Sequence, residues 1–371
     1  MQLLSLKYER FRNLAQVELV PGPRTTVAVG ENGQGKTNLL EGLYFLATLK
    51  SLRAAKLSEL VAFGEQTAKV TGRFLLNGAE REISVEVEAG ARRASVDGKR
   101  AATLEAYFGG VSVVAFTPDD LQVVKGGPEG RRNFLDRAVF NRFPVFLGES
   151  REYARALKSR NRLLKDRAPV AHLSAWDATL ARVGARLWTR RRALMRELGT
   201  RAQGAFARIG RTEAPAIYAY APSHLPDLDF PEASEAQLQQ ALAALLDQRL
   251  QRDVERGFTS VGPHVDDLEL SLGTHAARAY ASQGQARALV LAWKVAEIEN
   301  LFATSGFLPL LLLDDVSSEL DPERNQFLMG YLAESGAQVF LTTTDPALVQ
   351  RAAGDGTVWY QVKSGTVART K

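Results

Sequence analysis

The stretch TTVAVGENGQGKTNLLEGLYFLATL, residues 25–49, decides the fold. It opens with a short run rich in β-branched residues, and residues 38–49 have helical spacing. Between them, Gly30 to Thr37 read GENGQGKT and match the phosphate-loop pattern G-x-x-x-x-G-K-[ST]. Glycines let such a loop fold around a phosphate with its backbone N–H groups pointing inward. A strand, this loop and a helix in succession predict an α/β nucleotide-binding domain.

Two side chains at the end of this loop carry specific chemistry. Lys36 can reach the β- and γ-phosphates of a nucleotide, and the hydroxyl of Thr37 can bind Mg²⁺. A helix that starts near Gly35 adds the positive end of its dipole. The alternative is a glycine-rich turn without a ligand, which the Lys-Thr pair and the strand–helix context disfavour.

A second stretch supplies the carboxylate that a phosphate loop needs. LPLLLLDD, residues 308–315, predicts a buried strand that ends in Asp314 and Asp315. Asp314 would hold Mg²⁺ through water, and Asp315 stands where a general base for an attacking water could sit. The alternative is a strand that ends in a polar turn; the presence of Gly30 to Thr37 makes the metal interpretation preferable. PERNQFLMGYLAES and AQVFLTTTD then predict a helix and another buried strand.

The middle of the chain has a different pattern. Residues from about 131 to 256 are rich in Ala, Leu, Arg and Gln with helical periodicity. We expect one long helix over residues 173–209, with Ser174 as its cap, and another over 235–257. The predicted architecture is an α/β lobe of residues 1–125 and 305–371, interrupted by a mainly helical lobe of residues 126–304 with a basic surface.

Charge and composition limit the class of protein. The net charge is +5, but residues 131–201 contain about 18 Lys or Arg and about six Asp or Glu. This excess indicates a polyanionic partner, although a solvated helical surface is the alternative. The absence of cysteine excludes disulfides and fits a reducing cytosol. No signal peptide or bilayer-length apolar run is present, so we expect a soluble cytoplasmic protein.

The motif LLLLDDVSSELD together with GENGQGKT resembles the ABC-type ATPase heads, which include structural-maintenance-of-chromosomes proteins. In that family a loop of the form S-x-G-Q precedes a helix, and Ser282 to Gln285 read SQGQ. The resemblance implies that Ser282, Gly284 and Gln285 contact the ATP of a second protomer in an ATP-dependent homodimer. For the tetrapeptide alone, a capped helix start is the alternative.

Three further stretches resemble the RecF family of bacterial recombination mediators: FRNL, FTPDDLQVVKGGPEGRRNFLD and VGPHVDDLEL. This resemblance covers nearly the whole chain. It implies ATP-dependent binding to gapped, single-stranded or double-stranded DNA in recombinational repair and replication. It also implies cooperation with RecR to load RecA. The alternatives are the ATPase subunit of an ABC transporter, without its membrane domain, and a small-molecule kinase.

The resemblance also implies roles for individual residues. Residues 30–37 (Gly30, Glu31, Asn32, Gly33, Gln34, Gly35, Lys36 and Thr37) would bind ATP, with Arg12, Asn13 and Arg53 nearby. Lys36 and Asp315 would be catalytic, Thr37 and Asp314 would hold Mg²⁺, and residues 318–321 would link the two sites. Asp315 stands where most ABC heads have glutamate, so we expect a weak ATPase that acts as a timed clamp.

Overall fold

A computed structural model describes residues 1–54, 56–108, 111–210, 212–225 and 228–370. The chain forms two compact units. The first consists of Met1–Gln122 and Gln283–Lys371, and the second of Val123–Ser282. The first unit is therefore built from two separate stretches of sequence. Residues 283–304, which the predicted boundaries assign to the helical lobe, belong to the first unit. The reason is that helix α10 (Gln283–Ser305) packs against strand β8 (Val113–Phe116) and helix α3 (Pro118–Leu121).

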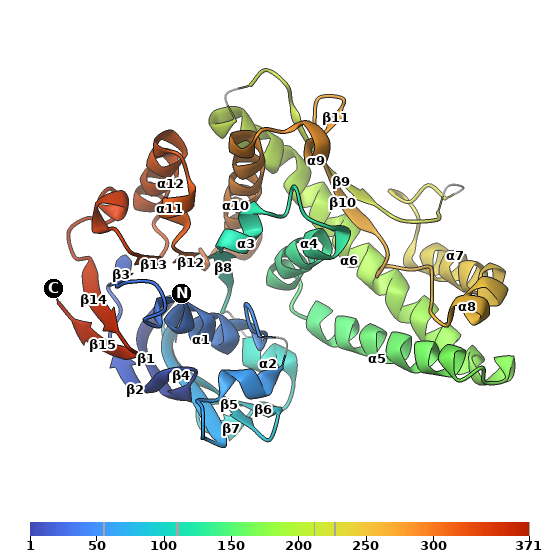
Figure 1. The fold of residues 1–371 in the computed structure, drawn as a ribbon, viewed down its shortest axis with the longest axis horizontal. Helices are drawn as coiled ribbons and strands as arrows, with labels where there is room; N and C mark the ends of the chain where they lie inside the picture. The colour runs from blue at the N-terminus through green and yellow to red at the C-terminus, as the bar shows by residue number, and fades with distance from the viewer. Residues whose placement is uncertain (55, 109–110, 211, 226–227, 371) are drawn as a thin grey trace. The chain divides into compact units, whose positions relative to one another are not determined.

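One sheet of the first unit has its strands in the order β15-β14-β3-β13-β12-β8 (Figure 1). Strands β14, β3, β13, β12 and β8 are parallel, and β15 is antiparallel to β14. The three central strands are almost fully buried, which explains their continuous apolar sequences. The strands of this sheet other than β8 are β3 (Thr25–Val29), β12 (Leu310–Asp314), β13 (Val339–Thr343), β14 (Val358–Lys363) and β15 (Thr366–Arg369).

The other sheet of this unit is antiparallel, in the order β2-β1-β4-β5-β6-β7. Asn77 and Gly78 form the two-residue turn between β4 and β5, with φ of 51° and 81°. These positive angles suit the hairpin that the Asn-Gly pair predicts. The strands are β1 (Gln2–Phe11), β2 (Leu14–Leu19), β4 (Thr67–Leu76), β5 (Ala79–Glu88), β6 (Ala91–Val96) and β7 (Lys99–Arg100).

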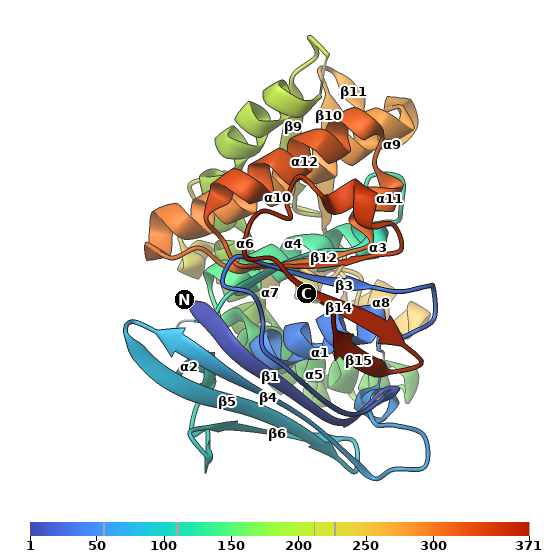
Figure 2. The ribbon, with the colours of Figure 1, turned by 90° about the vertical axis from the view of Figure 1, so that its left-hand side faces the viewer.

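Helix α1 (Lys36–Thr48) lies between the two sheets, as Figure 2 shows. The close approach of α1 to β1 depends on Gly42. A Cβ added there would lie 2.3 Å from Cε1 of Tyr8. Helices α10, α11 (Val316–Glu319) and α12 (Pro322–Ser335) lie on the other side of the parallel sheet (Figure 2). The unit also contains α2 (Leu104–Phe108), and the 3₁₀ turns η1 (Leu57–Leu60) and η3 (Pro346–Val349).

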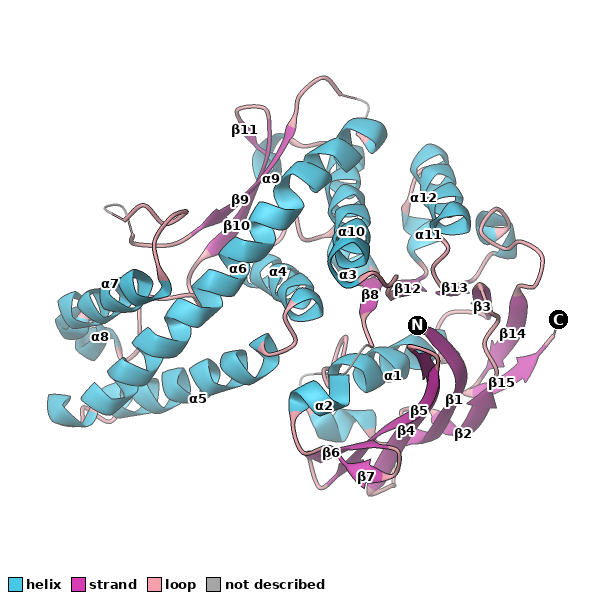
Figure 3. Cartoon of the chain, turned by 180° about the vertical axis from the view of Figure 1, so that it is seen from behind, coloured by secondary structure: helices cyan, strands magenta, loops and turns pink. Residues whose placement is uncertain are grey.

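The second unit is mainly helical (Figure 3). Helices α5 (Phe146–Lys165) and α6 (Ser174–Ile209) run side by side as a hairpin, and α6 also packs against α7 (Glu235–Gln248). A three-stranded sheet, in the order β11-β10-β9, packs on α6 through β9. The other elements are α4 (Pro128–Arg142), η2 (Val170–His172), β9 (Ala216–Ala221), α8 (Leu250–Arg256), β10 (Asp267–Leu272), β11 (His275–Ala276) and α9 (Ala277–Tyr280).

Three details of the predicted elements are wrong. Strand β9 lies inside the stretch expected to be helical. It pairs with β10, more than 40 residues away, so the contacts that stabilise it leave no pattern in the local sequence. The helix expected over 235–257 is interrupted at Arg249. Ser174 is the first residue of α6 and does not cap it. The cap position is Leu173, which has no side-chain hydrogen bond to the helix, and the hydroxyl of Ser174 donates to the carbonyl oxygen of Ala171. Among the described residues, no helix is long and apolar enough to cross a membrane.

Candidate nucleotide-binding site

The loop of residues 30–37 connects β3 to α1 and is shaped by its glycines. Gly33 and Gly35 have φ of 79° and 110°, a region that side chains other than glycine rarely adopt. Gly30 is needed for a different reason. A Cβ added there would lie 2.4 Å from the carbonyl oxygen of Val362 on the neighbouring strand. The conformation is therefore fixed by both backbone angle and packing.

The ammonium group of Lys36 lies within this loop. It donates to the carbonyl oxygens of Gly30 at 2.6 Å and Glu31 at 2.9 Å. Burial lowers the pKa of Lys36, while the charges of Asp315 and Asp314 oppose that shift. The lysine is thus held beside two carboxylates at the mouth of the loop.

Thr37, in the first turn of α1, meets Asp314 at the end of β12. The Thr37 hydroxyl donates to Oδ1 of Asp314 at 2.9 Å, and Thr342 of β13 donates to the same oxygen at 2.9 Å. Asp314 is 8% exposed. A hydroxyl and a carboxylate are hard oxygen ligands suited to Mg²⁺, which takes few protein ligands and completes its shell with water and phosphate.

Asp315 follows directly and has an unusual environment. Its φ is 50°, and its backbone N–H donates to the carbonyl oxygen of Thr342 at 3.1 Å. Its Oδ1 is buried and has no hydrogen-bond partner among the described residues. Burial raises the pKa of Asp315, with Lys36 opposing and Asp314 reinforcing the shift. A carboxylate in this state is ready to accept a hydrogen bond.

These residues line one pocket of about 260 Å³. Its polar wall therefore combines glycine backbone, one lysine, one hydroxyl and two carboxylates. Asp119 of α3 is exposed next to Pro118, which lines the pocket. The lining residues are Asn32, Gly33, Gly35, Lys36, Thr37, Asn38, Arg53, Pro118, Asp314 and Asp315.

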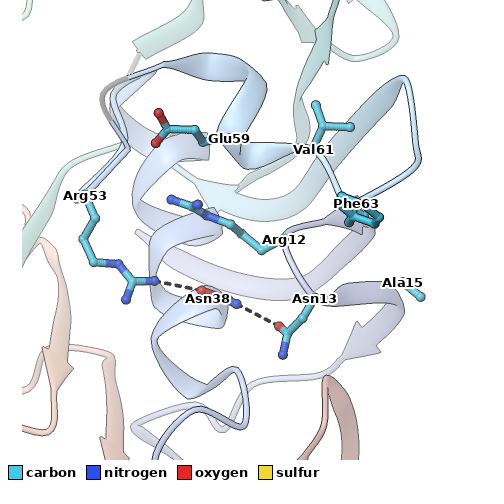
Figure 4. Close-up of a pocket in the computed structure, with 9 residues that line it drawn as sticks. Arg12, Asn13, Ala15, Asn38, Arg53, Glu59, Val61 and Phe63 are labelled. Carbon is cyan, nitrogen blue, oxygen red and sulfur yellow. Dashed lines mark hydrogen bonds between the residues drawn. The ribbon is translucent and has the colours of Figure 1, made fainter.

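A larger pocket of about 800 Å³ adjoins the first and shares Asn38 and Arg53 with it. Figure 4 shows a chain of hydrogen bonds along its floor, in which Arg53 donates to Asn38 and Asn38 donates to Asn13, both at 2.8 Å. Arg12 also lines this pocket, so the structure brings together the three residues expected near the nucleotide. Phe63 lies at the rim with its side chain fully exposed.

Glu41 of α1 organises the arginines of the larger pocket. It is 0% exposed and accepts from Arg12 at 2.9 and 3.0 Å, from Ser51 at 2.5 Å and from Arg53 at 3.4 Å. Burial alone would raise the pKa of Glu41, but hydrogen bonds from Arg12 and Ser51 and the arginine charges lower it. Sequence analysis did not single out this residue, because a glutamate within a helix carries no local signal.

The S-x-G-Q segment differs slightly from its expected form. Helix α10 begins at Gln283, so Gly284 and Gln285 lie in its first turn. Gly284 packs against Arg324 of α12, whose Nη1 would lie 3.0 Å from a Cβ added at Gly284. Arg324 is held by Asp321 at 2.5 Å. In the described part of the first unit, Gly284 and Gln285 line neither of the two pockets.

Lys125 is a residue of the second unit that sequence analysis missed. Its ammonium group donates to the carbonyl oxygen of Arg278 at 3.2 Å and also to those of Ala277 and Ala281. These carbonyls close the short helix α9 directly before Ser282. Lys125 therefore fixes the backbone that leads into the S-x-G-Q segment.

Comparison with known proteins agrees with this geometry. The model of the RecF/RecN/SMC N terminal domain family matches residues 2–367. The DNA replication and repair protein RecF of Myxococcus xanthus is 68% identical over 370 residues, which cover 99% of this chain and 97% of that protein. The chain belongs to the RecF family. The RecF of Anaeromyxobacter sp. is 56% identical, with 99% of both chains covered.

Solved structures support the same assignment. A structure described as the recombination mediator protein RecF-ATPrS in the RecFOR pathway has a TM-score of 0.88 and 29% identity. The match covers 100% of this chain and 98% of that chain. A structure described as an Smc head bound to the C-winged helix domain of ScpA has a TM-score of 0.56 at 16% identity, over 100% of this chain and 97% of that chain. The fold is thus a P-loop ABC-type ATPase head, as predicted.

Proposed function

We propose that this RecF-family protein is an ATP-dependent, DNA-binding switch in DNA replication and recombinational repair. One observation carries the proposal: the loop of residues 30–37, Asp314 and Asp315 line a single pocket. Such a pocket supplies donors for phosphate, oxygen ligands for Mg²⁺ and a carboxylate for water. The DNA replication and repair proteins that share its sequence provide the biological setting.

The two adjoining pockets divide the nucleotide between them. The triphosphate lies in the smaller pocket, on the backbone N–H groups of residues 30–37 and the ammonium of Lys36. The base and ribose lie in the larger pocket, beside Arg12, Asn13 and Arg53. The exposed ring of Phe63 stacks on the base, because stacking would cover an aromatic side chain that the protein itself leaves in water.

Thr37 and Asp314, whose oxygens already lie 2.9 Å apart, would hold Mg²⁺. When bound, the ion neutralises charge on the phosphate oxygens. Asp315 orients and accepts a proton from the attacking water through its unpartnered oxygen. Its side chain is one methylene shorter than glutamate, which places the water less well and makes hydrolysis slow.

Two protomers assemble around ATP. Ser282, Gly284 and Gln285 of one protomer contact the γ-phosphate held by the other, and hydrolysis then releases the dimer. The close packing of Gly284 against Arg324, in which a Cβ at residue 284 would lie 3.0 Å from Nη1, supports an ordered surface at this helix start. DNA, RecR and, through it, RecA are the proposed partners, and a cytoplasmic location follows from access to bacterial DNA.

The test is the mass of the protein in solution, measured by light scattering without nucleotide, with ADP and Mg²⁺, and with ATP and Mg²⁺. We expect a monomer that becomes a dimer only with ATP. Neither Lys36→Met, which loses the phosphate contact, nor Ser282→Arg, which blocks the partner's ATP, should dimerise. Unchanged mass with bound ATP would contradict the dimer. Transfer of phosphate to an acceptor other than water would contradict the ATPase.

A further inference from the structure

Most arginines on α4 and α6 are neutralised within the second unit. Arg160 of α5, fully buried, is neutralised in the same way. The predicted excess of positive charge is therefore not available as a whole to a polyanion. The ion pairs are Arg131 with Asp267, Arg142 with Glu197, Arg160 with Asp177 and Asp253, Arg182 with Glu152, Arg186 with Glu235, Arg190 with Glu149, Arg191 with Asp136, and Arg196 with Glu232.

Helix α5 separates its charges by face. Its carboxylates Glu149 and Glu152 accept from Arg190 and Arg182, so they lie on the side that packs on α6. Its apolar side chains, such as Tyr153, are buried. Five cations remain on the other face, and we name them the α5 stripe: Arg151, Arg155, Lys158, Arg162 and Lys165.

The α5 stripe is continuous and accessible. Its members recur every three or four residues, the spacing of side chains on one face of a helix. All five are exposed. Only Arg162 makes an ion pair with a described residue, at 3.7 Å to Asp166, and both side chains are largely in water. Such an exposed ion pair contributes little to the stability of the fold, so Arg162 can exchange Asp166 for another anionic partner.

The geometry of the stripe fits the backbone of a nucleic acid. From residue 151 to residue 165 a helix rises about 21 Å, with a cation every 4.5–6 Å or so. A duplex presents a negative charge about every 1.7 Å of its axis, so a linear row of this length meets several phosphates. The row contains no aromatic side chain for stacking on bases, which favours contacts to phosphate over contacts to bases.

We infer that the α5 stripe binds the phosphate backbone of DNA. This inference rests on the proposed DNA binding and locates it on one helix face. Because the contacts are to phosphate, binding through this stripe is independent of base sequence and sensitive to salt.

The experiment measures DNA affinity of the full chain, with ATP and Mg²⁺, over a series of salt concentrations. The probe is a gapped duplex, in two unrelated sequences. The variant is Arg155→Gln with Lys158→Gln, and the matched control is Lys99→Gln with Arg100→Gln on the exposed edge strand β7. Both variants lose two positive charges, so a general charge effect would act on them equally.

We expect the slope of log affinity against log salt to fall by about 1.8 in the α5 variant, equally for both sequences, and to stay unchanged in the control. ATP-dependent dimerisation should be unaffected, which shows that the variant is folded. An unchanged slope in the α5 variant, or an equal loss in the control, would overturn the inference. If the wild-type protein fails to bind DNA at low salt, the proposed DNA binding itself is wrong.

Discussion

The hydroxyl of Thr37 lies 2.9 Å from a carboxylate oxygen of Asp314, although 276 residues separate them in the chain. This contact joins the start of α1 to the end of β12. It exists because β3 and β12 flank β13 in one parallel sheet, so that their carboxyl ends face the same edge. The same oxygen of Asp314 also accepts from Thr342.

This contact predicts that Asp314→Asn weakens the binding of ATP in the presence of Mg²⁺ but not in its absence. An amide removes the negative charge that would hold Mg²⁺ but keeps the size of the side chain. We expect ATP affinity with Mg²⁺ to fall about tenfold or more, with little change in EDTA. Calorimetric titration under both conditions measures this. Thr342→Val, which removes the second hydrogen bond to Asp314 and the acceptor for the Asp315 N–H but keeps the carboxylate, is the control and should lose much less.

Asp315→Asn should separate ATP binding from hydrolysis. The amide cannot accept a proton from water, so we expect the hydrolysis rate to fall by about 10²–10⁴-fold while ATP binding persists. Dimers formed with ATP should therefore last longer than those of the wild type. Phosphate release and light scattering over time measure the two effects. Dimers that dissociate as fast as the wild type would contradict a role for Asp315 in timing release.

The raised pKa of Asp315 also predicts a dependence of stability on pH. The folded protein holds this proton more tightly than the unfolded chain does, so ionising Asp315 reduces the free energy of unfolding as pH rises above 3.8. Asp315→Asn removes that loss, and asparagine tolerates the positive φ at this position. We expect the Asp315→Asn variant to melt at a higher temperature than the wild type at pH 7. The difference in melting temperature should be smaller near pH 4.

Phe63→Ala should weaken binding of ATP but not of inorganic triphosphate. The ring stacks on the base in our proposal, and such aromatic contacts contribute about 0.5–1.5 kcal/mol, or roughly 2- to 13-fold in affinity. Competition against a fluorescent ATP analogue measures both ligands. Phe258→Ala, an exposed phenylalanine of the second unit, serves as the control. Equal losses for ATP and triphosphate would place the base elsewhere.

Lys125→Met should damage the S-x-G-Q segment without touching the ATP pocket of its own chain. Three backbone carbonyls before Ser282 lose the ammonium group of Lys125, and we expect ATP-dependent dimer affinity to fall by about tenfold or more. Mixing Lys125→Met with Lys36→Met should restore part of the ATPase, because a mixed dimer contains one intact composite site.

Mixing Lys125→Met with Ser282→Arg should restore nothing, since both chains then offer a defective segment. Restoration in this second mixture would show that Lys125 acts on its own pocket instead. Failure of both mixtures, with normal ATP binding by each variant, would indicate a folding role for Lys125 alone.

Local sequence was sufficient for the parts of the site that lie on one turn. Gly30 to Thr37 predict both the loop and the helix after it, because glycine angles and a helix start are properties of adjacent residues. LLLLDD predicts a buried strand with carboxylates at its end for the same reason. The resemblance then identified the family over nearly the whole chain, and the family model and relatives confirm it.

Long-range contacts decided the rest. Residues distant in sequence meet in strand β9, in the carbonyls that accept from Lys125 and in the network on Glu41. No local sequence pattern predicts these contacts. The basic segment shows the limit most clearly. The number of arginines is known from the sequence, but burial and ion pairing decide which of their charges reach solvent. Only the folded chain neutralises Arg160 and Arg191 and leaves Arg155 and Lys158 facing water.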